Sequence, residues 1–111
     1  MNVQFKKGVL DLVLLHLVYD EPLSAYDVVH RLSNRLDVSA NTIYPLLRRL
    51  EKDQYLMHEK RPSTMGAPKK VFTLTKQGKA HYIALKNAWL DFQAEVNLLL
   101  GGNTDEEDNV S

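Results

Sequence analysis

The sequence lacks cysteine, a membrane-length apolar run and any net charge. Without cysteine there is no disulfide framework and no thiolate metal site. The four histidines are scattered and have no ligand spacing, so we expect no metal. The apolar run from Gly8 to Tyr19 is too short to span a bilayer, and Asp11 and His16 interrupt it. No small-residue cleavage site follows it either. We therefore expect a cytoplasmic protein without a membrane partner.

Motifs for catalysis are missing as well. The sequence contains no nucleophile–base pair, glycine-rich phosphate loop or paired carboxylates, so we expect neither an enzyme nor a bound cofactor.

The zero net charge hides an uneven distribution: residues 1–80 hold 13 Lys and Arg against 8 Asp and Glu, whereas residues 81–111 hold 1 against 6. A basic body with an acidic appendage fits nucleic-acid binding.

The chain is long enough for one domain with one core. The apolar pattern of its N-terminal part predicts two helices. Residues 5–19 form a first predicted helix that is apolar on almost every side. Such a helix must be covered on more than one side, and another subunit is one source of that cover. A second helix is predicted from Ser24 to about Asn34, because Ser24 and Asp27 have the spacing of a capping box.

The most informative segment is a third predicted helix, which begins at Ser39, a good N-cap residue. Its apolar residues recur at the spacing of one buried face: Ile43, Leu46, Leu47 and Leu50. The opposite face is polar, aromatic and cationic, a combination suited to a groove lined by phosphates. Two helices joined by so few residues form a helix-turn-helix. Pro45 lies beyond the first turn and predicts a kinked or tightened start of this helix.

After the third helix the pattern changes to that of two strands. Residues 55–60 and 70–74 are strand-like, and the turn-forming residues 61–69 separate them. The predicted ribbon carries Arg61, Lys69 and Lys70 at its tip. A helix-turn-helix followed by a basic hairpin is a winged helix. We therefore predict a mainly α fold with a small β-hairpin, in which residues 1–75 form a winged helix-turn-helix DNA-binding domain.

A long final helix is predicted over residues 76–100, with Thr75 as its N-cap. Its large apolar residues alternate steps of three and four, the period of a coiled-coil seam: Tyr82, Leu85, Trp89, Phe92, Val96 and Leu99. We expect this seam to form the interface of a homodimer; the alternative is a helix that folds back on its own domain. Gly101 and Gly102 end the helix, and we expect the acidic tail, residues 101–111, to be disordered.

Four segments together resemble the PadR family of bacterial transcriptional regulators, in its compact branch with a single C-terminal helix: residues 8–15, 25–29, 42–51 and 71–78. The last two are the more specific, since a generic winged helix does not need the Thr-x-Tyr-Pro-Leu-x-Arg-Arg-Leu-Glu string of residues 42–51. The resemblance implies a homodimeric repressor that releases its operator when a small aromatic or drug-like molecule binds. Ala25 and Asn41 depart from it by standing where glycine is common, and Asn41 can bond adenine bidentately.

The expected DNA contacts come from the second helix, the third helix and the ribbon: Tyr26, Ser39, Asn41, Thr42, Tyr44, Arg48, Arg49, Arg61, Lys69 and Lys70. Tyr26 is either a phosphate ligand through its hydroxyl or a half-buried core residue. Arg48 and Arg49 point about 100° apart on a helix. We expect one of them to face the groove while the other pairs with Glu51 or a phosphate.

Trp89 is the only tryptophan and lies in the seam, where it either packs or flanks a cavity for a planar aromatic molecule. The resemblance supports a cavity, since some family members with a tryptophan at the matching place bind flat drugs by stacking. Such a ligand site would comprise Trp89, Phe92, Leu14 and Val18.

Two other functions stay open. One is a winged-helix protein-interaction module with a dimerising tail and no DNA role. The other is a small-molecule carrier, which would not explain the cationic helix and ribbon.

Overall fold

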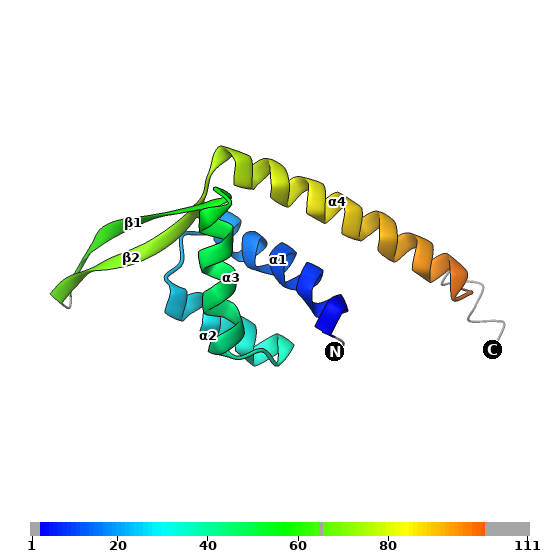
Figure 1. The fold of residues 1–111 in the computed structure, drawn as a ribbon, viewed down its shortest axis with the longest axis horizontal. Helices are drawn as coiled ribbons and strands as arrows, with labels where there is room; N and C mark the ends of the chain where they lie inside the picture. Colours follow the sequence, from blue (N-terminus) through cyan, green and yellow to red (C-terminus); the bar gives the residue numbers. More distant parts are fainter. Residues whose placement is uncertain (1–2, 65, 102–111) are drawn as a thin grey trace.

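The computed structural model describes residues 3–64 and 66–101, which form four helices and one hairpin (Figure 1). In chain order these are α1 (Val3–Asp20), α2 (Ala25–Leu36), α3 (Ala40–Lys52), β1 (Leu56–Ser63), β2 (Gly66–Leu74) and α4 (Lys76–Leu99). The predicted mainly α fold with a hairpin, followed by a long helix, is confirmed. Apart from Gly101, the tail predicted to be disordered lies outside the described residues.

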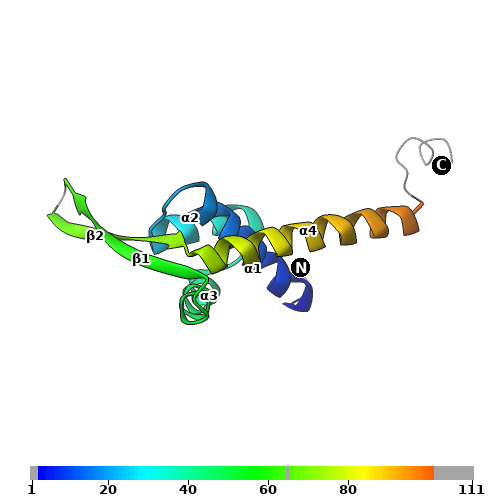
Figure 2. The same cartoon turned by 90° about the horizontal axis from the view of Figure 1, so that it is seen from above.

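Helix α1 lies at the centre of the fold, packed on α2, α4 and β2 (Figures 1 and 2). Leu10, Leu14, Leu15 and Val18 are buried in the core that these elements share. Leu12, Val13 and Leu17 are partly buried against the same core. Elements of the same chain therefore cover much of the apolar surface of α1, each from a different side of the helix.

Helix α2 begins with the predicted capping box. The Asp27 N–H donates to Ser24 Oγ at 3.1 Å, and the Ser24 N–H donates to Asp27 Oδ2 at 3.2 Å. The helix continues to Leu36, two residues beyond the predicted end, and stops where Asp37 adopts a left-handed conformation with φ of 54°. A short turn then leads to α3, so α2 and α3 form the helix-turn-helix.

Helix α3 buries the predicted stripe of Ile43, Leu46, Leu47 and Leu50. Ser39 occupies the N-cap position, but the prediction that its side chain caps the helix is wrong, because Ser39 makes no side-chain capping hydrogen bond. Its carbonyl instead accepts from the Thr42 and Ile43 N–H groups at 3.0 and 3.2 Å. This is the tightened first turn expected from Pro45, and the helix continues through the proline.

Strands β1 and β2 pair antiparallel to form a wing that is longer than predicted. Arg61 pairs with Lys69 and Lys60 with Lys70, so these cations line the sides of the wing and the prediction that they sit at its tip is wrong. Most of residues 61–69 are strand because each strand of a two-stranded ribbon has a free edge, where proline removes no ladder bond. The register shifts between Arg61 and Ser63, beside Pro62.

The base of the wing is fixed to the helical body. Phe72 of β2 exchanges two backbone hydrogen bonds with Leu23, in the turn between α1 and α2, at 2.8 and 3.3 Å. Phe72 and Leu23 are both buried in the core. The wing therefore has a defined position relative to the helix-turn-helix.

Helix α4 starts at the base of the wing and extends past the body (Figures 1 and 2). Thr75 caps it as predicted, because Thr75 Oγ1 accepts from the Gly78 N–H at 2.8 Å. The prediction that Tyr82 belongs to the dimer seam is wrong, because Tyr82 is only 3% exposed and packs in its own chain's core. Its hydroxyl lies 2.6 Å from His16 Nδ1, and its ring stacks on Tyr19.

Candidate nucleic-acid interface

The outer face of α3 is polar and open to solvent. The buried stripe fixes this orientation, because positions on the opposite side of the helix must point outward. Asn41, Thr42 and Arg48 are exposed, and Tyr44 is 41% exposed. These four residues thus lie where a recognition helix presents its side chains to a DNA groove.

A cleft of about 260 Å³ joins this face to the wing. Tyr44 and Arg48 line it from α3, and Lys70 and Phe72 line it from β2. The Lys70 ammonium lies 5.2 Å from the centre of the Phe72 ring, which holds this flexible cation over the cleft. Elements distant in the sequence therefore bring two cations and two aromatic rings to a single concave surface.

The two neighbouring arginines of α3 have different surroundings. Arg49 donates to Asp11 Oδ1 of α1 at 2.7 Å and lies 3.8 Å from Asp53. The hydrogen bond with Asp11 and the charges of Asp11 and Asp53 raise the pKa of Arg49 despite its partial burial. Arg48 makes no ion pair within residues 8–64 and 66–101. Arg49 therefore braces α3 against α1, which leaves Arg48 as the cation directed outward.

One predicted alternative was that Glu51 pairs with Arg48 or Arg49, and this alternative is wrong. The Glu51 carboxylate instead pairs with His58 of β1. This contact joins the last turn of α3 to the beginning of the wing, and so it adds to the attachment at Leu23 and Phe72.

Two cations of the wing, Lys69 and Arg61, lie close to acidic side chains. Lys69 Nζ lies 3.5 Å from Asp27 Oδ2, at the start of α2, and Arg61 lies 3.4 Å from Glu59 on the same strand. Burial raises the pKa of Asp27, but hydrogen bonds with Ser24 and the charge of Lys69 outweigh this effect and lower it. Lys69 and Arg61 are exposed. Both side chains thus remain accessible to a phosphate that competes with these carboxylates.

Tyr26 stands at the N-terminus of α2, close to the base of the wing. It is 71% exposed and stacks on His30 with 6.0 Å between ring centres. The alternative of a half-buried core tyrosine is therefore wrong, and the Tyr26 hydroxyl is open to solvent.

A second concave surface lies between α1 and α4. This groove has a volume of about 290 Å³, and Val9, Leu12, Leu85, Trp89 and Phe92 are among its lining residues. The prediction that Leu14 and Val18 line the same cavity does not hold, because both are buried in the core on another side of α1. Val9 and Leu12 take their place.

Sequence reasoning missed two acidic residues that position this interface. Asp11 holds Arg49, and its signal was that it is the only acid in the apolar run from Gly8 to Tyr19. Asp27 was recognised only as a helix cap, although it also pairs with Lys69. Nothing in the sequence pattern could have paired residues so far apart along the chain.

A helix-turn-helix whose second helix presents a polar face beside a basic hairpin defines the winged-helix class of DNA-binding regulators. Within that class, the model of the PadR-like transcriptional regulator family matches residues 14–84. The chain belongs to the PadR-like family.

Solved structures of regulators agree with this assignment. A Streptococcus transcriptional regulator is 32% identical, with a TM-score of 0.81 and coverage of 88% of this chain and 98% of that one. A PadR-like regulator from Bacillus cereus is 29% identical, with a TM-score of 0.81 and coverage of 90% and 99%. A PadR-like transcription factor from Bacteroides fragilis is 36% identical, with a TM-score of 0.71 and coverage of 86% and 94%.

The family assignment sets the coarse function. Its members are transcriptional regulators that bind DNA, and they are not enzymes. Among the described residues, no helix is long and apolar enough to cross a membrane.

Proposed function

We propose that this chain is a homodimeric repressor that reads a specific duplex operator with the outer face of α3. The observation that carries this proposal is the position of Tyr44 and Arg48. Both are exposed opposite the buried stripe and line one cleft with Lys70 of the wing. A guanidinium without an acidic partner is suited to bidentate contact with guanine, and Asn41 to contact with adenine.

The proposed contacts divide into base readout and backbone positioning. Asn41, Thr42, Tyr44 and Arg48 would enter the major groove, because they occupy the exposed face of α3. Exposed groups beside this face would bind phosphates and fix the register on the duplex: Ser39, Tyr26, Arg61, Lys69 and Lys70. Arg49 would act indirectly, by holding α3 against α1.

A dimer is supported by the apolar surface of α4. Phe92 is 56% exposed and Leu99 is 84% exposed, while Leu85, Trp89 and Val96 are partly buried. These residues follow one another at steps of three and four along α4, the spacing of the predicted coiled-coil seam. A second copy related by two-fold symmetry would cover them and place the two α3 helices on half-sites about one helical turn, roughly 34 Å, apart.

The groove between α1 and α4 supports an effector site for a planar aromatic molecule. Trp89 and Phe92 line it, and their ring centres lie 6.4 Å apart at a tilted angle. A flat guest between Trp89 and its symmetry mate in the dimer would relieve repression if it favours a spacing of the recognition helices that does not fit the operator. Quenching of Trp89 fluorescence by a panel of planar aromatic compounds tests this part. If no compound quenches at sub-millimolar concentration, Trp89 is a packing residue.

The DNA-binding proposal is tested with duplexes selected by the protein from a random library. Arg48→Gln should weaken binding to the selected sequence by about tenfold or more, because one base contact contributes roughly 1–3 kcal/mol. Arg35→Gln is the matched control, since Arg35 is an exposed arginine of α2 outside the cleft. Wild-type affinity should also fall steeply with salt. A protein-interaction module would select no sequence, and the two variants would behave alike.

A further inference from the structure

A third concave surface lies between α1 and α2, on the flank of α1 away from the Trp89 groove. It has a volume of about 510 Å³, within the roughly 300–1,000 Å³ range of small-molecule sites. Val13 and Leu17 line it from α1, whereas the Trp89 groove is lined by Val9 and Leu12. The two surfaces therefore share no residue of α1.

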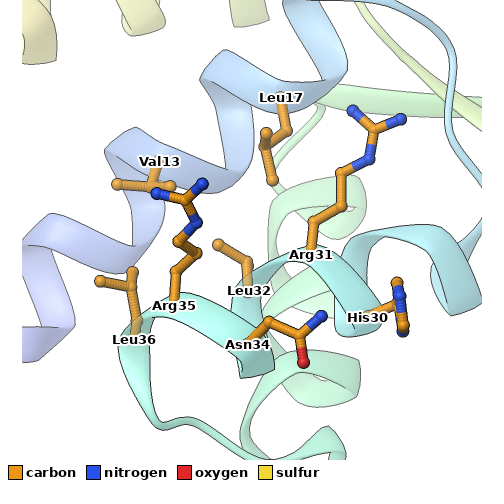
Figure 3. A pocket seen from close by; sticks show the side chains of 8 residues that line it. All are labelled: Val13, Leu17, His30, Arg31, Leu32, Asn34, Arg35 and Leu36. Carbon is orange, nitrogen blue, oxygen red and sulfur yellow. The ribbon is translucent and has the colours of Figure 1, made fainter.

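The groove combines an apolar floor with a cationic rim. Val13, Leu17 and Leu36 are partly buried and Leu32 is fully buried. Figure 3 shows Arg31 and Arg35 rising from α2 on the side that faces α1, with Leu32 between them and Val13 and Leu17 across from them. A ligand that fits both parts has a negative head group and an apolar body.

The two arginines differ in charge balance. Arg31 Nη2 donates to Glu21 Oε1 at 3.0 Å, so this arginine already has a carboxylate partner. The Arg35 side chain makes no hydrogen bond or ion pair within the described part of the chain. No acidic side chain lines the groove. The groove thus offers one uncompensated guanidinium, which matches a single carboxylate in charge and in its two-point geometry.

We propose that this groove binds a small amphipathic monocarboxylate, with its carboxylate on Arg35 and its apolar body over Val13, Leu17 and Leu32. This site is separate from the DNA interface and from the proposed aromatic site, and the proposal does not depend on either. Leu36 is the last residue of α2, so the ligand would lie beside the turn that leads to α3.

Decanoate, used well below its micelle concentration, is the probe, and methyl and amide NMR shifts report binding directly. We expect saturable shifts of Val13, Leu17 and Leu32 methyl signals, while the methyl signals of Val9 and Leu85 in the other groove stay unchanged. Decanol, which has no charge, and decyltrimethylammonium, which has the opposite charge, should bind at least tenfold more weakly.

Matched arginine variants complete the test. Arg35→Gln should weaken decanoate binding roughly tenfold, the loss expected from removing one charge-assisted hydrogen bond. Arg48→Gln changes an exposed arginine outside the groove and should bind decanoate like the wild type. Equal affinity of Arg35→Gln and wild type, equal binding of decanol and decanoate, or shifts confined to Val9 and Leu85 would each overturn the proposal. Both variants change exposed side chains, so loss of folding does not confuse the result.

Discussion

Gly78 of α4 lies against the backbone of Tyr55, the residue before β1, and replacing it by alanine should destabilise the protein. A Cβ at this position would lie 1.9 Å from the Tyr55 carbonyl oxygen and 2.9 Å from its carbon. These are backbone atoms, so they cannot move aside as a flexible side chain can. The same oxygen accepts from the Thr75 N–H at 3.1 Å, so a shift at Tyr55 also strains the start of α4.

The size of the effect follows from three contributions. Overpacking against a fixed neighbour costs about 1–3 kcal/mol, and loss of the hydrogen bond to the Tyr55 oxygen costs about 0.5–1.5 kcal/mol more. Alanine gains about 1 kcal/mol over glycine within a helix. The net loss for Gly78→Ala is about 2 kcal/mol, which corresponds to a fall of roughly 8–16 °C in Tm for a domain of this size.

Thermal unfolding followed by circular dichroism at a fixed protein concentration measures this loss. The control is Gln77→Ala, which creates the same residue at the neighbouring, exposed position of α4. We expect this control to leave Tm within a few degrees of wild type. If Gly78→Ala and Gln77→Ala unfold at the same temperature, the close approach of α4 to Tyr55 does not constrain the fold, and our account of this joint is wrong.

Three further predictions follow from the contacts described above. Phe92→Asp should sediment as a monomer and lose tight operator binding, because it places a charge in the seam; an intact dimer would contradict the proposed interface. The lowered pKa of Asp27 means that its stabilisation is present above its unfolded value and is lost as pH falls through the folded value. The stability difference between wild type and Asp27→Asn in urea should therefore be constant near neutrality and shrink below about pH 4. Asp11→Asn should reduce stability to urea by about 1 kcal/mol, since it leaves Arg49 with the more distant Asp53, and an unchanged midpoint would show that Asp11 contributes nothing.

Local patterns in the sequence were enough to predict the order of the elements. The α3 stripe, the Ser24–Asp27 capping box and the Thr75 cap each depend on residues within one or two turns, and all three are present in the structure. The strands are longer than their sequence pattern predicts, because proline favours turns in general but a ribbon with free edges accommodates it within a strand.

The errors at the candidate site arise from contacts between distant segments. Tyr82 fits the seam by spacing, but α1 covers that turn of α4 and provides His16 as its hydrogen-bond partner. Arg49 is equivalent to Arg48 in the sequence pattern, and both are exposed. Only the position of Asp11 gives Arg49 an ion pair to α1. Side chains with the same local pattern thus acquire different roles from tertiary neighbours that are remote in sequence.

The central claim is that the outer face of α3 meets the bases of the operator. Side-chain NMR signals of the arginine Nε–H groups, recorded with and without a selected operator duplex, test it most directly. We predict that the Arg48 signal shifts and becomes protected from solvent exchange, while the Arg35 signal is unchanged. A complex in which Arg35 shifts and Arg48 does not would place the DNA on another face and contradict this account.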